Sequence, residues 1–145
     1  MRLATIALIT VALGACNDLR GFEGVWQGPR VGDSPVLSVG IAPMATASLT
    51  IGGIDTNGIR GTLSIDGLAT TADVVSIAGA EADVLSGMTF DGSPMRVYLS
   101  FVATTDGYGE LFAVIALYDD RRVEVRVMRG GQLPVYAIFA LTEGP

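Results

Sequence analysis

The last third of the chain constrains the fold most, because it consists of four long strand-like runs that short turns separate. The clearest run, 121–129, alternates Val123, Val125 and Val127 with charged residues. Half-buried antiparallel strands have this period of two, so we expect the valines to be buried and the charged residues to be solvated. The charged residues are Arg122, Glu124 and Arg126, and the other runs are 95–104, 110–118 and 134–142.

The connections between these runs predict a meander. Asp106-Gly107, Asp119-Asp120 and Gly130-Gly131 mark the three connections, and these residue types favour tight turns. Links this short make neighbouring strands antiparallel. Upstream, apolar alternation and glycine-rich punctuation predict further strands. These are 22–28, 35–41, 46–51, 59–65, 72–78 with Val75 and Ile77 inward, and 84–90, although 80–86 alternatively forms one helical turn.

These patterns predict an all-β fold, an antiparallel up-and-down meander of roughly eight to ten strands. A barrel removes the exposed edges of a sheet, whereas a sandwich keeps them. Consecutive hairpins with short links favour a small barrel, and a β-sandwich is the alternative. No repeat, linker or low-complexity segment divides this region, so we expect a single domain.

The first residues are a leader rather than part of this domain. After Arg2, the residues from Leu3 to Leu13 are apolar apart from two threonines, and small residues follow at Gly14-Ala15. A positive start, a short apolar middle and small residues at the end are typical of a secretory signal. The stretch is too short for a transmembrane helix, which needs roughly 20 residues.

The residues Leu13-Gly14-Ala15-Cys16 resemble the lipobox of bacterial lipoproteins. In that family the cysteine receives diacylglycerol and the chain is cleaved before it. The resemblance implies a signal peptide at 1–15, a lipidated Cys16 with a short tether at 16–21, and a single β domain at 22–145. Asn17 follows the cysteine where an aspartate would indicate inner-membrane retention, so the resemblance favours the outer membrane, facing the periplasm.

The lone cysteine agrees with lipidation of Cys16. An exported chain with a single cysteine has no internal disulfide partner, so the thiol is free, intermolecular or modified. Each buried acyl CH₂ contributes about 0.8 kcal/mol, and two or more chains anchor much more firmly than one. The alternative is an ordinary signal peptide with an incidental cysteine.

The charge and residue types of the mature chain exclude several functions. Without residues 1–15, eight arginines stand against 15 Asp and Glu, which gives a net charge of −7, and there is no histidine. An acidic domain repels phosphate backbones, so we expect no nucleic-acid partner. Zinc sites built on Cys or His, and nucleophiles that need His, are also excluded. The remaining options are carboxylate chemistry, a hard metal ion bound by oxygen ligands, or no chemistry. We expect no catalytic residue, metal or cofactor.

Gly24-Val25-Trp26 lies in the first expected strand and resembles the Gly-x-Trp motif of the lipocalin superfamily. In that family the tryptophan closes the floor of the barrel, often packed by an arginine from near the last strand. The resemblance implies that Gly24 and Trp26 take these places, with Arg129 as the possible partner. It also implies a lipocalin-like barrel that holds a small apolar ligand.

The expected strands 110–118 and 134–142 are apolar on both faces. In an antiparallel sheet, a second apolar face indicates that something covers it. The cover would be a partner protein, lipid or another part of the chain. Alternatively nothing covers this face, because Ala, Val and Tyr are ordinarily tolerated on a protein surface. The candidate apolar binding face consists of Phe112, Val114, Tyr118, Tyr136 and Ile138.

Two acidic segments have the composition of turns. Asp119-Asp120 occupies a hairpin connection, where Asp bonds its own backbone. Asp55-Thr56-Asn57-Gly58 resembles part of a calcium loop, but Asp66 stands where the bidentate glutamate is needed. We therefore expect turn chemistry rather than metal binding or acid–base catalysis at both segments.

Together these features predict a lipid-anchored, non-catalytic lipoprotein of the bacterial cell envelope. Its barrel would bind a small apolar ligand, or alternatively present the sheet face of its C-terminal strands to an envelope protein. A ligand carrier needs an apolar internal cavity of about 300 Å³ or more. An interaction module needs a filled core and an exposed apolar patch on the last four strands. An enzyme with paired carboxylates ranks last, because the acids fall mostly in turns.

Overall fold

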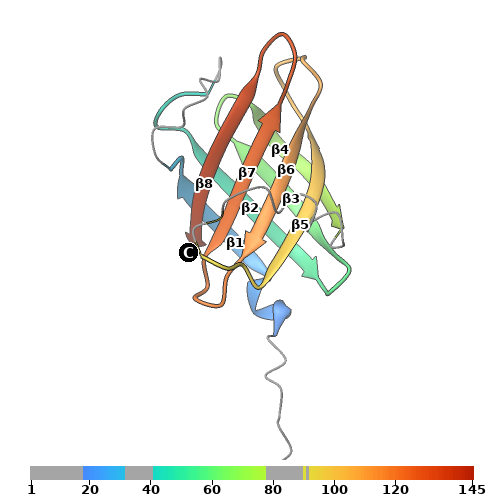
Figure 1. Ribbon diagram of the computed structural model, residues 1–145, viewed down its shortest axis with the longest axis vertical. Coiled ribbons are helices and arrows are strands. Elements are labelled where there is room, and N and C mark those ends of the chain that lie inside the picture. The colour runs from blue at the N-terminus through green and yellow to red at the C-terminus, as the bar shows by residue number, and fades with distance from the viewer. Residues whose placement is uncertain (1–17, 32–40, 78–89, 91) are drawn as a thin grey trace, which may run out of the picture.

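The computed structural model describes residues 18–31, 41–77, 90 and 92–145, which form one β-barrel (Figure 1). A short 3₁₀ helix, η1 (Leu19–Phe22), precedes the barrel. The strands are β1 (Gly24–Pro29), β2 (Thr46–Ile54), β3 (Gly58–Ile65), β4 (Ala69–Ile77), β5 (Arg96–Ala103), β6 (Glu110–Leu117), β7 (Val123–Arg129) and β8 (Val135–Glu143).

The strands pair antiparallel in chain order, and β8 returns to pair with β1. The predicted up-and-down barrel is therefore confirmed, and the sandwich alternative is not observed. All but the last residue of the expected strands 35–41 and 84–90 lie outside the described residues, as does the alternative helical turn at 80–86. The narrowest seam joins β4 to β5 through a single pair, Ile77 with Leu99.

Inward-facing side chains fill the barrel. Alternate residues of each strand point inward, as the period of two requires. The largest of these side chains are no more than 2% exposed, which leaves the described interior packed with apolar groups. They are Trp26, Leu49, Ile51, Ile59, Leu63, Ile65, Leu68, Tyr98, Leu111, Ile115, Leu117 and Phe139.

Two glycines are required by the close approach of neighbouring strands. A Cβ on Gly28 would lie 1.8 Å from the backbone oxygen of Ala140, and one on Gly61 would lie 1.8 Å from that of Thr50. Any other residue would push these backbones apart, which is a frequent reason for glycine inside a strand. Both positions therefore support the tight coiling of the small barrel.

The alternation in β4 differs from the expectation. Val74 is buried, whereas Val75 is 71% exposed, so the predicted inward position of Val75 is wrong. The pairs Leu63–Ala72 and Ile65–Ala69 show one extra residue on β4, and Thr71 there has a φ of 48°. A bulge of this kind moves the following side chains to the opposite face of the strand. The side chain of Ile77 is outside the described part of the chain.

The start of the domain also differs from the expectation. Leu19–Phe22, predicted as the end of the tether and the start of a strand, forms η1. Leu19 packs against the core and Phe22 is buried within it. The Asp18 side chain accepts a hydrogen bond from the Arg20 amide and caps this turn. In the described residues, no helix has the length and apolar character needed to cross a membrane.

Candidate functional site

One end of the barrel, which we call the floor, is closed by Phe22, Trp26 and Arg121. The indole N–H of Trp26 donates a 2.8 Å hydrogen bond to the Phe22 carbonyl, and the two rings stack with centroids 5.5 Å apart. Figure 1 shows η1 beneath this end, beside the turn between β6 and β7. Gly24 has a φ of 137°, which explains the glycine of the Gly-x-Trp motif, because other residues rarely adopt that conformation.

The arginine on the floor is Arg121. Its guanidinium lies 5.6 Å from the Trp26 ring and 5.7 Å from the Phe22 ring, and it pairs with Glu143 at 2.9 Å. Arg129, the predicted partner, packs elsewhere, so that part of the prediction is wrong. Arg121 precedes β7, whereas Arg129 is its last residue. Because β7 runs parallel to β1 in an up-and-down barrel, only the beginning of β7 lies at the floor.

Arg129 closes the opposite end, which we call the distal cap. Its guanidinium makes two hydrogen bonds to the Asp106 carboxylate, of 3.0 and 2.7 Å, and its Nε donates to the Leu133 carbonyl. The loop that carries Asp106 crosses to the β3–β4 turn, where the Thr105 amide and hydroxyl both donate to the Leu68 carbonyl. These bonds hold the loop across the end of the barrel.

The Asp106 carboxyl has an unusually low pKa. Hydrogen bonds from Arg129 are the main cause, and the Tyr108 amide and the Thr104 hydroxyl also stabilise the ionised form. The Arg129 side chain is only 7% exposed, so this ion pair is largely shielded from solvent. The cap therefore depends on a charged Asp106.

Two hollows lined by described residues open to solvent at the wall. One has a volume of about 580 Å³ and is formed by β2, β3 and the end of β4. The other, of about 390 Å³, lies between β1 and β2.

Part of the outer face of β6 and β7 is covered by the chain itself. Val114 and Tyr118 are 0% and 3% exposed, although their positions alternate with inward ones. The Phe90 ring lies 4.5 Å from the Arg126 guanidinium, and a Cβ on Gly92 would lie 3.9 Å from the Tyr118 ring. The described residues just before β5 therefore cover this part of the outer face, so here the cover is another part of the chain.

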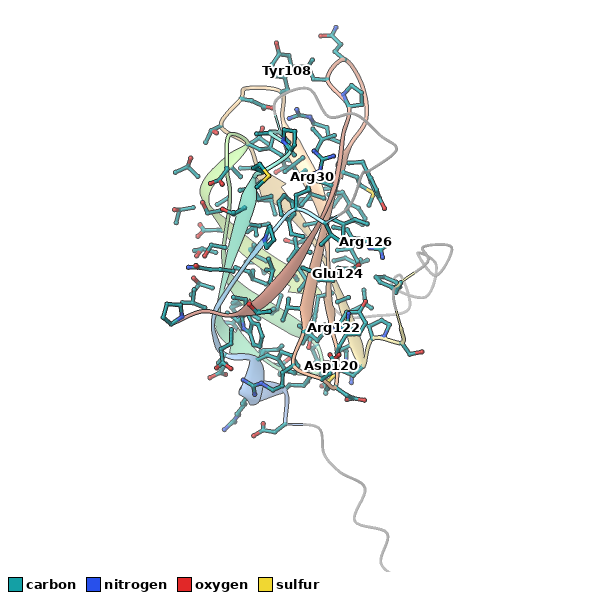
Figure 2. The ribbon with its side chains drawn as sticks, turned by 90° about the vertical axis from the view of Figure 1, so that its left-hand side faces the viewer. Arg30, Tyr108, Asp120, Arg122, Glu124 and Arg126 are labelled. Atoms are coloured by element: carbon teal, nitrogen blue, oxygen red, sulfur yellow. The ribbon has the colours of Figure 1, made fainter. Side chains whose placement is uncertain are left out.

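Arg126 is buried beneath this cover. It is 5% exposed and forms a salt bridge with Glu124, so the prediction that Arg126 is solvated is wrong. Figure 2 shows Glu124 and Arg126 midway along the barrel, between Tyr108 at one end and Asp120 and Arg122 near the other. The predicted burial of the valines of β7 is confirmed, but the cover over its outer face comes from a segment distant in sequence.

The remaining face residues are half-buried, and two of them belong to a row of apolar side chains that crosses four strands. Phe112 pairs with Phe101 on β5 and with Met128 on β7, and Met128 pairs with Tyr136 on β8. We call these four residues the apolar row. Phe101 is 65% exposed and its ring contacts that of Phe112 at 5.4 Å. Ile138 lies beside the row and is half-buried.

Phe101 was missed by the sequence analysis. It alternates with Ser100 and Val102 on β5, and both of these are buried. The period of two therefore assigned Phe101 to the outer face, but an isolated phenylalanine gives no sign of its neighbours. The register of β5 against β6 brings it to Phe112.

The acidic segments have the expected turn chemistry. One Asp55 oxygen accepts hydrogen bonds from the Asn57 and Gly58 amides, at 2.7 and 3.0 Å. Asp66 accepts from both the amide and the hydroxyl of Thr46, and these bonds lower the pKa of its carboxyl. Hydrogen bonds from Arg122 lower the pKa of Asp120. Among the described residues, no three metal-ligating side chains lie together.

The geometry defines a small, closed, up-and-down β-barrel consistent with a lipocalin-like fold. Comparison of the chain with protein-family models, curated proteins and solved structures gives no match.

Proposed function

We propose that this protein is a lipid-anchored lipoprotein of the bacterial cell envelope whose barrel is a non-catalytic interaction module. The apolar row would dock on an envelope protein. One observation carries the proposal: the described interior is packed and closed at both ends, while Phe101 stands 65% exposed on the outer face. Large apolar side chains that gather on a surface mark interaction sites.

The packed interior favours this module over a carrier with an apolar ligand inside the barrel. Such a ligand needs an internal cavity of about 300 Å³ or more. Trp26, Leu63 and Phe139 reach into the interior from three strands, and all three are fully buried. Uptake of a ligand would also require the floor or the distal cap to open.

The anchoring at Cys16 rests on the lipobox resemblance, because residues 1–17 lie outside the described part of the chain. The described chain starts at Asp18 next to η1, at the floor. Two residues span at most about 7 Å, so a lipidated Cys16 would hold the floor against the bilayer. The apolar row would then stand on the side wall, within reach of a neighbouring envelope protein.

The carboxylates support a role without catalysis. Asp55, Asp66 and Asp120 each bond nearby backbone or side-chain donors in turns, and Asp106 is held by Arg129. No histidine is present to act as a base. The acids therefore serve the turns and the cap of the fold.

Site-specific photocrosslinking in intact cells tests the docking proposal. A photoreactive residue at Phe101 is expected to give a discrete adduct with another envelope protein. The matched control is Thr50, an exposed position on β2, which should give none. Adducts that are absent at Phe101, or identical at both positions, would contradict the proposal.

A further inference from the structure

The larger hollow in the outer wall has features that the proposed docking face does not explain. Its volume of about 580 Å³ falls within the range of small-molecule sites. Gly53, Arg60 and Val75 lie in register across β2, β3 and β4, and all three line it. The apolar row lies on β5 to β8, so the hollow is a separate surface.

Two glycines of the hollow are not required by the backbone. A Cβ on Gly53 would meet no atom within 4 Å, and one on Gly52 would meet only the Arg60 oxygen, at 3.8 Å. Neither residue has a positive φ. Glycine inside a strand often marks a bulge or a place where a ligand approaches closely. The pairing of β2 with β3 shifts register between Ile51 and Gly53, and this irregularity leaves the backbone of both glycines uncovered. By contrast, a Cβ on Gly58 would lie 2.6 Å from the Ser76 oxygen, so packing alone explains that glycine.

The hollow also contains a cation and an exposed apolar side chain. Arg60 is exposed, and no described carboxylate lies within salt-bridge distance of it, unlike Arg121 or Arg129. Val75, its cross-strand neighbour, is 71% exposed.

We infer that this hollow binds a small amphipathic carboxylate. The Arg60 guanidinium matches a carboxylate in charge and in its paired donors. The apolar part of the ligand would lie over the bare backbone of Gly52 and Gly53 and against Val75. Asp55 stands at the hairpin end of the hollow, and its charge orients the carboxylate toward Arg60. The site is on the wall of the barrel, not inside it.

Calorimetric titration of the full-length protein in lipid nanodiscs with hexanoate tests this inference, with empty nanodiscs as the blank. Hexanoate is expected to bind saturably at up to millimolar concentration. Acetate, which lacks the apolar part, and hexanol, which lacks the charge, are each expected to bind at least about tenfold more weakly.

Two variants locate the site. Arg60→Gln removes the cation and is expected to weaken hexanoate binding at least about tenfold. Gly53→Leu places a side chain into open space, so the fold is retained while the hollow fills and binding is lost. Arg20→Gln, which removes an exposed charge at η1, is the matched control and should bind as the parent does.

Several results would overturn the inference. These are no saturable binding of hexanoate, equal binding of hexanol, or unchanged binding by Arg60→Gln and Gly53→Leu in chains with parental melting temperatures. None of them affects the crosslinking at Phe101. Failure of the carboxylate site and failure of the docking proposal are therefore distinguishable.

Discussion

The two ends of the barrel are closed by different chemistry. The floor is aromatic, with Trp26 and Phe22 stacked under the exposed guanidinium of Arg121. The distal cap is ionic, with Asp106 and Arg129 joined by two hydrogen bonds. Apolar burial is insensitive to pH, whereas an ion pair requires its acid to be charged. We therefore expect the two ends to respond differently to mutation and to acid.

The largest expected effect concerns the proposed lipid anchor next to the floor. Cys16→Ser removes the proposed site of lipidation, so membrane attachment should be lost completely while the barrel stays folded. Incorporation of labelled palmitate and fractionation of cells measure this. Unchanged labelling in the variant would show that the lipobox interpretation is wrong, and the proposed orientation of the floor would lose its basis.

The next largest effect is on the floor itself. Trp26→Ala should lower the free energy of unfolding by ~3–5 kcal/mol, because a fully buried ring is replaced by a cavity. Chemical denaturation followed by circular dichroism measures the change.

Met44→Ala is the matched control for this loss, since Met44 is 85% exposed and its truncation should change stability by about 0.5 kcal/mol or less. Equal stabilities of the two variants would mean that the floor contributes little to the fold.

Acid should open the distal cap before it affects the floor. The pKa of Asp106 is lowered in the folded protein, so the cap is fully stabilised above the ordinary aspartate pKa of about 3.9. This contribution is lost as the pH falls below that value toward the folded pKa. The protection of the Thr105 and Tyr108 amides against hydrogen exchange, relative to unprotected amides at the same pH, should therefore fall below about pH 4, ahead of the protection at the core of the floor.

The variant Arg129→Gln tests the cause of that acid response. Without the guanidinium, the Asp106 pKa moves back toward its ordinary value, and exchange at Thr105 should already be fast at neutral pH. Asp120 at the floor end also has a lowered pKa, but its partner Arg122 is exposed, so its protonation should leave the stacked rings in place. Simultaneous opening of both ends in acid would contradict the comparison.

The smallest effect is expected for Arg121→Gln. Its contacts with the two rings and with Glu143 lie at the surface, and its side chain is 48% exposed. Exposed cation–π contacts and salt bridges each contribute about 1 kcal/mol or less. A loss of stability as large as that of Trp26→Ala, measured by the same denaturation, would show that Arg121 holds the floor together.

The same contrast shows what could be predicted about the candidate sites. The Gly-x-Trp resemblance identified Trp26 for the floor, because a local motif carries the positive φ of Gly24 and the ring that follows it. It did not identify Arg121 as the arginine beside Trp26. Which end of β7 lies at the floor depends on how many antiparallel strands separate β7 from β1, and a local motif does not give that number. The wall hollow was not predicted, because Gly53, Arg60 and Val75 meet only through strand register.

Most strands and turns of the described barrel can be predicted from the amino-acid sequence alone, because side-chain alternation and turn chemistry are local properties of the chain. Tertiary structure decided which faces are covered. The extra residue in β4 exposes Val75, and Phe90 comes to lie on Arg126. Register across four strands brings Phe101 into the apolar row. Burial on an outer face depends on contacts between distant segments, which a period of two within one strand does not encode.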